Sequence, residues 1–151
     1  MKRALLGMCI LALAGTVVYA GSHSKTSYQD DVRPIMENQC FMCHGDNAPS
    51  LEEFDADKET YEARSQGPRM STYAETVEFI KGEETGALMR RLDDGSNTAD
   101  GNPGNMYDYL GRTDEEREKN LAVFKKWVGH WTLKRADDLT EKDKEKFTLA
   151  E

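Results

Sequence analysis

Apolar residues along this chain recur at the spacing of a helix rather than that of a strand. Over 27–40, four residues fall at i, i+3, i+4 and i+8, on one face of a helix: Val32, Ile35, Met36 and Cys40. Ser27 can cap this helix at its N-terminus. Alternating apolar and polar residues never extend over four positions without a charge or a turn residue between them. The predicted fold class is therefore all-α.

Three capping patterns predict further helices. One opens at Thr72 and ends at Gly82, and a short helix is expected over 84–92. Another pattern opens the longest helix, over 113–131, and a third predicts an exposed helix from Thr140. The longest helix has a broad apolar stripe made of Leu121, Phe124, Trp127, Val128 and Trp131.

Two long stretches between these helices are predicted to be loops. Residues 45–69 contain Pro49, Gly67 and Pro68, and residues 93–111 are the most turn-rich part of the chain. Loops longer than about 12–15 residues are uncommon unless they are functional or disordered. The acidic start of 93–111 resembles a calcium loop but lacks the EF-hand spacing and its terminal glutamate, so no calcium site is predicted.

The first twenty residues have the pattern of a secretory signal peptide. Lys2 and Arg3 precede an apolar run over 4–18, and Ala20 supplies the small residue that a signal peptidase reads. An uncleaved anchor is the alternative, although the run is short for the roughly 20 residues that span a membrane. The predicted organisation is a cleaved signal peptide over 1–20, one domain over 21–131 and a charged C-terminal extension over 132–151. The protein is expected to be periplasmic or otherwise exported.

Composition narrows the possible partners and cofactors. Only 38% of the 151 residues are hydrophobic and 32% are charged, so a core made of protein alone would be thin and a bound apolar group would enlarge it. Without Lys2 and Arg3, 18 basic residues face 28 acidic ones, a formal charge of −10. A surface of this charge disfavours nucleic acid and anionic membranes, and favours protein partners with a basic surface. No stable membrane insertion is expected after cleavage of the signal peptide.

The strongest chemical motif is Cys40-Phe41-Met42-Cys43-His44, in the sequence "NQCFMCHGDN". Three interpretations compete for it. A structural zinc site needs four ligands, and no second pair of cysteines or histidines is present. A redox-active dithiol needs a βαβ context, which the helical pattern excludes. Covalent attachment of a c-type haem is the third, and this pentapeptide is its signature.

The spacing agrees with haem chemistry. Each thiol adds to one haem vinyl group, and one helical turn places Cys40 and Cys43 along the same haem edge. His44 then binds iron through one ring nitrogen while the other donates a hydrogen bond to a carbonyl, which fixes the tautomer. The carbonyl of Pro49 is the predicted acceptor. One covalent haem c is therefore the predicted cofactor, with His44 as its first axial ligand.

The second axial ligand is predicted to be Met106. It follows Pro103 and Gly104 in "NPGNMY", a loop whose backbone can approach a haem face closely. Met70, in the loop after Pro68, is the main competitor, and His130 or an open position are the remaining alternatives. Met89 has the spacing of a core residue.

With these motifs the chain resembles the class I c-type cytochromes over most of residues 27–131. That resemblance implies crossed N- and C-terminal helices beside the haem, and electron transfer by a His/Met-ligated iron. It also leads us to expect a Gly-Pro pair after the haem histidine, for which Ala48-Pro49 is the nearest sequence, and a proline after the methionine, where Tyr107 stands.

Two other functions remain open at this stage. One is a haem enzyme or gas-binding cytochrome with an open sixth site, although no acid–base pair lies near the motif. The other is a permanent electron-transfer subunit of a larger oxidoreductase, docked through 132–151. Arg69, Arg90 and Arg91 could pair with haem propionates, but exposed surface charge is the simpler interpretation.

Overall fold

Helices dominate the part of the chain that the computed structural model describes, residues 25–151. Apart from one isolated bridge between Ser27 and Ala150, it contains no strand pairing, so the all-α prediction is confirmed. The predicted signal peptide, residues 1–20, lies outside the described residues. In chain order the elements are η1 (Tyr28–Val32), α1 (Arg33–Gln39), α2 (Phe41–His44), α3 (Leu51–Ala56), α4 (Lys58–Ala63), α5 (Tyr73–Lys81), α6 (Ala87–Leu92), η2 (Tyr107–Leu110), α7 (Asp114–Val128), η3 (Ala136–Asp138) and α8 (Glu141–Lys144).

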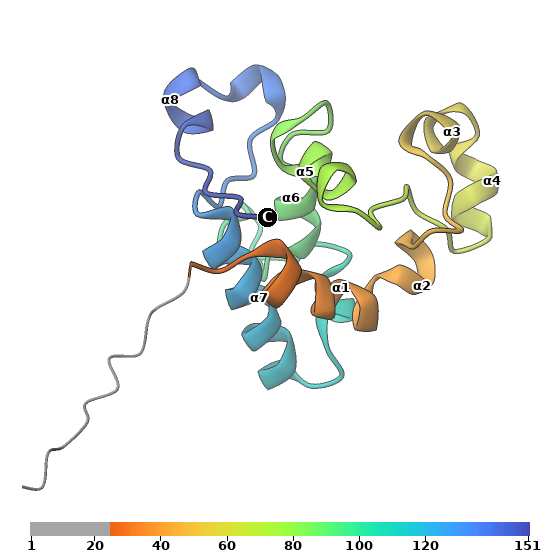
Figure 1. Cartoon of the computed structure of the whole chain (residues 1–151), viewed down its shortest axis with the longest axis horizontal. Helices are drawn as coiled ribbons and strands as arrows, with labels where there is room; N and C mark the ends of the chain where they lie inside the picture. The colour runs from red at the N-terminus through yellow and green to blue at the C-terminus, as the bar shows by residue number, and fades with distance from the viewer. Residues whose placement is uncertain (1–24) are drawn as a thin grey trace, which may run out of the picture.

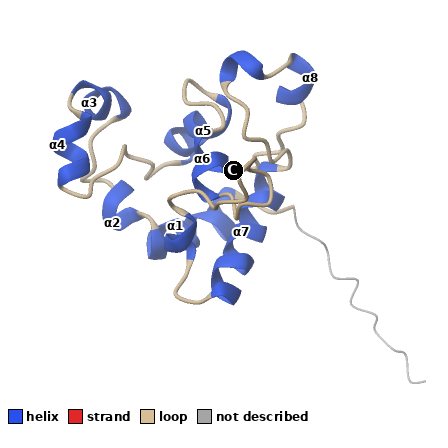
Figure 2. Ribbon diagram, turned by 180° about the vertical axis from the view of Figure 1, so that it is seen from behind, coloured by secondary structure: helices blue, strands red, loops and turns tan. Residues whose placement is uncertain are grey.

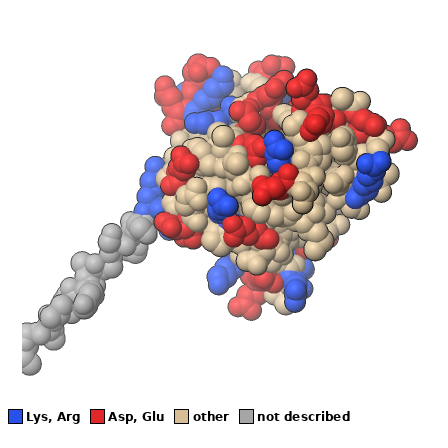
Figure 3. All heavy atoms as spheres, turned by 45° about the vertical axis from the view of Figure 1, so that its right-hand side comes forward, with Lys and Arg blue, Asp and Glu red and all other residues tan. Residues whose placement is uncertain are grey.

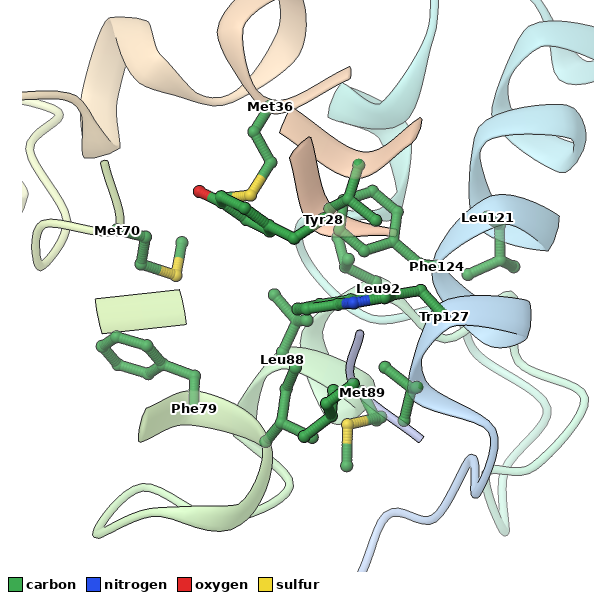
Figure 4. Close-up of a cluster of buried hydrophobic side chains, with 14 of the residues drawn as sticks. Tyr28, Met36, Met70, Phe79, Leu88, Met89, Leu92, Leu121, Phe124 and Trp127 are labelled. Carbon is green, nitrogen blue, oxygen red and sulfur yellow. The ribbon is translucent and has the colours of Figure 1, made fainter. Parts of the chain in front are cut away.

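The core lies where the first helical segment meets α7 (Figure 1). Ser27 caps η1 by accepting a hydrogen bond from the amide of Asp30, and η1 continues into α1. The predicted apolar face is buried, with Val32 and Met36 at most 1% exposed. Against it α7 places four residues of the predicted stripe, Leu121, Phe124, Trp127 and Val128, but the helix ends at Val128, so Trp131 lies beyond it and the predicted helix over 113–131 was too long. The ring of Trp127 lies 5.6 Å from that of Tyr28 (Figure 4). Large aromatic side chains of this kind bury much apolar area in a core.

Helices α5 and α6 close the other side of the core. Thr72 and Glu75 form the predicted capping box at the start of α5, and Gly82 ends it. On α6, Leu88, Met89 and Leu92 are buried, as their spacing predicted. Met89 is completely buried, which agrees with its expected place in the core.

The predicted loop over 45–69 contains two short helices instead. Ser50 and Glu53 form a capping box that opens α3, and α4 follows after Asp57. The rings of Phe54 and Tyr61 stack at 6.2 Å and join the two helices. This hairpin lies at one end of the molecule, away from α7 (Figures 1 and 2). The sequence analysis missed it because six residues are too few to show a 3.6-residue period, although Ser50-x-x-Glu53 is a capping pattern of the kind that predicted the other helices.

The predicted extension over 132–151 folds back onto the core. The carbonyl of Ala150 accepts hydrogen bonds from the amide of Tyr28 and from Nε1 of Trp127, each at 2.8 Å. Leu139 and Leu149 are buried. The end of the chain therefore belongs to the same body as α7, rather than forming a separate charged tail. Within it, α8 opens with the predicted capping box at Thr140 and buries no residue.

No helix among residues 25–151 is long and apolar enough to cross a membrane.

Candidate functional site

The cysteine–histidine motif forms one helical turn directly after α1. The amides of Cys43 and His44 donate to the carbonyl of Cys40 at 3.1 and 2.9 Å. A separation of three residues on such a turn puts both sulfurs on one side of it, whereas Met42 is 97% exposed. Both thiols are free and half-buried. Burial raises the pKa of the Cys40 thiol to about 12, so it is a neutral thiol near pH 7.

His44 has its tautomer fixed by the backbone. Its Nδ1 lies 2.7 Å from the carbonyl oxygen of Pro68, and because a carbonyl can only accept, Nδ1 carries the proton. The lone pair on Nε2 is then available to a metal. Burial lowers the pKa of His44, with the charge of Arg91 acting in the same direction and the bond to Pro68 against it. The imidazole is therefore neutral near pH 7, the form that binds iron.

The segment 67–70 lies alongside the motif and holds the histidine in place. Its amides donate to three carbonyls of 43–49: Gly67 to Cys43 at 3.1 Å, Arg69 to Pro49 at 2.7 Å and Met70 to His44 at 2.9 Å. A Cβ on Gly67 would lie 2.1 Å from Cε1 of His44. A residue with a side chain therefore does not fit at 67 while the ring is in this position.

The prediction that Pro49 accepts the hydrogen bond of His44 is wrong in this structure. The carbonyl of Pro49 is bonded to the amide of Arg69, and Pro68 takes the expected role. The hairpin of α3 and α4 is the reason, since it inserts 22 residues between His44 and Gly67 and then returns the chain to the motif. The sequence did contain a signal for this role. The resemblance to class I cytochromes leads us to expect a Gly-Pro pair after the haem histidine, and Gly67-Pro68 is the single Gly-Pro pair in the sequence.

The two candidate methionines occupy different surroundings. Met70 is 8% exposed, its amide is bonded to the carbonyl of His44, and it lies on the Phe79 side of the core cluster (Figure 4). Met106 is half-buried at the start of η2, and its amide donates to the carbonyl of Arg91 at 2.9 Å. Just before it, a Cβ on Gly104 would lie 2.3 Å from the carbonyl oxygen of Arg90. The loop of Met106 thus lies directly against the end of α6.

His130 takes part in other contacts. Its Nε2 is 3.7 Å from a carboxylate oxygen of Asp143, and its ring lies 5.6 Å from that of Phe147. Both neighbours belong to the C-terminal segment, which His130 helps to hold against the end of α7.

The arginines differ in how far they are already engaged. Arg90 donates through Nη1 to the carbonyls of Thr85, Leu133 and Lys134 at 3.1–3.3 Å. Arg69 is paired with Glu75 at 2.6 Å. Arg91 is exposed and its Nη1 donates to Asn105 at 3.0 Å. Among the three, Arg91 is the one whose charge acts on His44.

The donor set fits a covalently attached haem. Within residues 25–151, no group of three or more His, Cys, Asp or Glu side chains could hold a metal ion. The turn supplies two neighbouring free thiols and a neutral imidazole whose Nδ1 is already bonded to Pro68. Two thioether bonds and one axial nitrogen use all three groups.

Comparison with known proteins agrees with this chemistry. Residues 27–149 match the family described as PccH Cytochrome c. This chain belongs to the PccH cytochrome c family. It is also similar to the solved structure of the monohaem cytochrome PccH from Geobacter sulfurreducens, with 46% identity over 84% of this chain and 99% of that one, and a TM-score of 0.80. A comparison with curated proteins finds no match.

The predicted monohaem c-type cytochrome and its cytochrome fold are thereby confirmed, and membership of the family implies one covalently attached haem c. The match extends to residue 149, so it includes the C-terminal segment that folds back onto α7.

Proposed function

We propose that this cytochrome is an exported electron carrier whose haem is held by Cys40 and Cys43 and whose iron is ligated by His44 and Met106. The haem supplies the redox chemistry, an iron that alternates between the ferric and ferrous states. The observation that carries the proposal is the fixed imidazole of His44, with Nδ1 bonded to Pro68. A ligand held in this way stays in one orientation through both oxidation states, which keeps the reorganisation on electron transfer small.

Met106 is favoured over Met70 by what their backbones contact. The amide of Met70 is bonded to the carbonyl of His44 itself, and its side chain lies in the core cluster beside Phe79 (Figure 4). A thioether that joined His44 in holding the iron would come more readily from a segment that is not bonded to the attachment motif. Met106 comes from a separate loop, anchored on the end of α6 at Arg91, and its side chain is half-buried against the core cluster. A thioether ligand raises the reduction potential relative to a second histidine, which suits a carrier between respiratory proteins.

Arg91 would offer a positive charge to a haem propionate. It is exposed, close enough to lower the pKa of His44, and less engaged than Arg69 or Arg90. Guanidinium groups bind carboxylates through two parallel hydrogen bonds, so the side chain of Arg91 would be able to pair with a propionate.

The expected partners are redox proteins with a basic surface. The hairpin next to the attachment motif carries exposed acidic side chains at positions 52, 53, 55, 57, 59 and 62, against exposed basic ones at 58 and 64. Figure 3 shows acidic side chains spread over the face on which this end of the molecule comes forward. Such a charge pattern steers a basic partner toward the attachment end and weakens as salt is added. Export is inferred from the signal pattern over 1–20.

Absorption spectroscopy of methionine variants tests the ligand assignment. The oxidised holoprotein is expected to show the weak long-wavelength band of methionine-ligated haem, and Met106→Ala should abolish it while Met70→Ala retains it. Loss of the band in Met70→Ala alone would assign the ligand to Met70. If the wild-type protein lacked the band, methionine ligation itself would be wrong.

A further inference from the structure

Asp93 is a fully buried carboxylate at the end of α6, and the proposed electron-transfer site does not use it directly. Its side chain is 0% exposed. Oδ1 accepts hydrogen bonds from the amides of Gly95 and Asn97 at 2.9 and 3.1 Å. Oδ2 accepts from Nδ2 of Asn97 at 2.9 Å and from Nε1 of Trp131 at 2.8 Å.

Hydrogen bonds rather than an ion pair keep this carboxylate in the interior. None of the ion pairs found within residues 25–151 includes Asp93, and the nearby Lys125 is bonded to Asp94 at 3.1 Å and lies over the ring of Trp131. A buried carboxylate is costly unless donors satisfy it. Here four donors do so, and they come from two parts of the chain, the loop itself and Trp131 beyond α7. The group therefore fixes their relative position.

The same residue closes the loop that carries Met106. The amide of Gly104 donates to the carbonyl of Asp93 at 2.8 Å, and the amide of Met106 donates to the carbonyl of Arg91 at 2.9 Å. Residues 93–106 thus leave α6 at Asp93 and return to it at Gly104 and Met106. The carboxylate fixes the first turn of this loop, and Trp131 ties that turn to the C-terminal side of the core.

We propose that Asp93 is a positioning residue that keeps the 93–106 loop closed and thereby holds the thioether of Met106 on the iron. The inference rests on the proposed function, because it takes Met106 as the ligand. Asp93 acts through the loop and Trp131, not by contact with the haem. In Asp93→Asn one acceptor oxygen becomes an NH2 group that faces the donors of the loop or of Trp131, so the loop opens more often.

Competition by imidazole measures that opening. When imidazole binds the oxidised holoprotein, the iron–sulfur bond to Met106 breaks and an imidazole nitrogen takes its place, so the long-wavelength band disappears. The apparent affinity is proportional to the fraction of molecules with an open loop. We expect Asp93→Asn to bind imidazole about tenfold or more tightly than wild type does. Trp131→Phe removes one donor and keeps an aromatic ring, so it should also bind imidazole more tightly than wild type, by a smaller factor. Asp108→Asn, an exposed carboxyl that makes no side-chain hydrogen bond or ion pair among residues 25–151, should bind imidazole as wild type does.

The outcomes separate this inference from the ligand assignment. Far-UV circular dichroism on the same samples reports whether the protein has unfolded globally. The inference requires Trp131→Phe to be still folded at the imidazole concentrations that displace Met106. Wild-type imidazole affinity in both Asp93→Asn and Trp131→Phe, with the band lost in Met106→Ala, would overturn the role of Asp93 alone. If Met106→Ala kept the band, the proposed ligand would be wrong and the inference would fall with it.

Discussion

Gly67→Ala should disturb the site through one methyl group. The added Cβ would lie 2.1 Å from Cε1, 2.7 Å from Nδ1 and 2.9 Å from Nε2 of His44, all closer than non-bonded atoms approach. The ring cannot turn aside freely, because Nδ1 is held by Pro68 at 2.7 Å and Nε2 is the proposed iron ligand. Either the imidazole moves away from Pro68, or the segment 67–70 moves away from the motif.

Either movement should lower the free energy of unfolding. Overpacking of this kind destabilises a protein by about 1–3 kcal/mol. Weakening the bond to Pro68 also makes the imidazole of His44 a poorer electron donor, and this disfavours ferric iron. If about 1 kcal/mol of that preference is lost, the reduction potential of the one-electron couple rises by about 40 mV. The substitution should therefore lower stability and raise the potential together.

Urea unfolding and a spectroelectrochemical titration of the holoprotein measure the two effects. Gly82→Ala, at the end of α5, is the matched control: its Cβ would lie 2.6 Å from Cα of Glu78, and neither His44 nor the 93–106 loop is among its nearest atoms. This overpacking costs about 1–3 kcal/mol. The control should therefore lose similar stability with no change in potential. A Gly67→Ala protein with the wild-type potential and stability would refute the close packing of residue 67 on His44.

Two further predictions concern the C-terminal segment. Deleting residues 149–151 removes the buried Leu149 and the Ala150 carbonyl that receives the bonds of Tyr28 and Trp127, so urea unfolding should show a loss of about 3–5 kcal/mol; unchanged stability would mean that the segment is independent of the core. The second concerns Asp143, whose pKa is lowered by hydrogen bonds from Lys146, Lys134 and Thr140. A depressed carboxyl pKa contributes stability above its ordinary value of about 3.9 that is lost as the pH falls below it. The urea midpoint should therefore drop more between about pH 6 and about pH 3 in wild type than in Asp143→Asn, and equal drops would contradict the prediction.

The parts of the fold that sequence could predict are those fixed by local pattern. The apolar face of Val32 and Met36 and the stripe on α7 follow from a period of 3.6 residues, and the capping boxes at Thr72 and Thr140 mark where α5 and α8 begin. The attachment motif is equally local, since both sulfurs and the imidazole lie on one turn.

The parts that sequence missed depend on contacts between distant residues. Pro68 reaches His44 only because the hairpin of α3 and α4 returns the chain to the motif. The last residues looked like a solvated tail because their composition is charged. Their place is decided by backbone hydrogen bonds at Ala150, and carbonyl groups leave no signature in a sequence.

Exposure of the reduced wild-type holoprotein to carbon monoxide tests the central claim most directly. An electron carrier with both axial positions filled by His44 and Met106 should keep its spectrum unchanged at neutral pH, because no position on the iron is free. Rapid formation of a carbon monoxide adduct would show an open sixth site, and would contradict the account in favour of a gas-binding or catalytic haem protein.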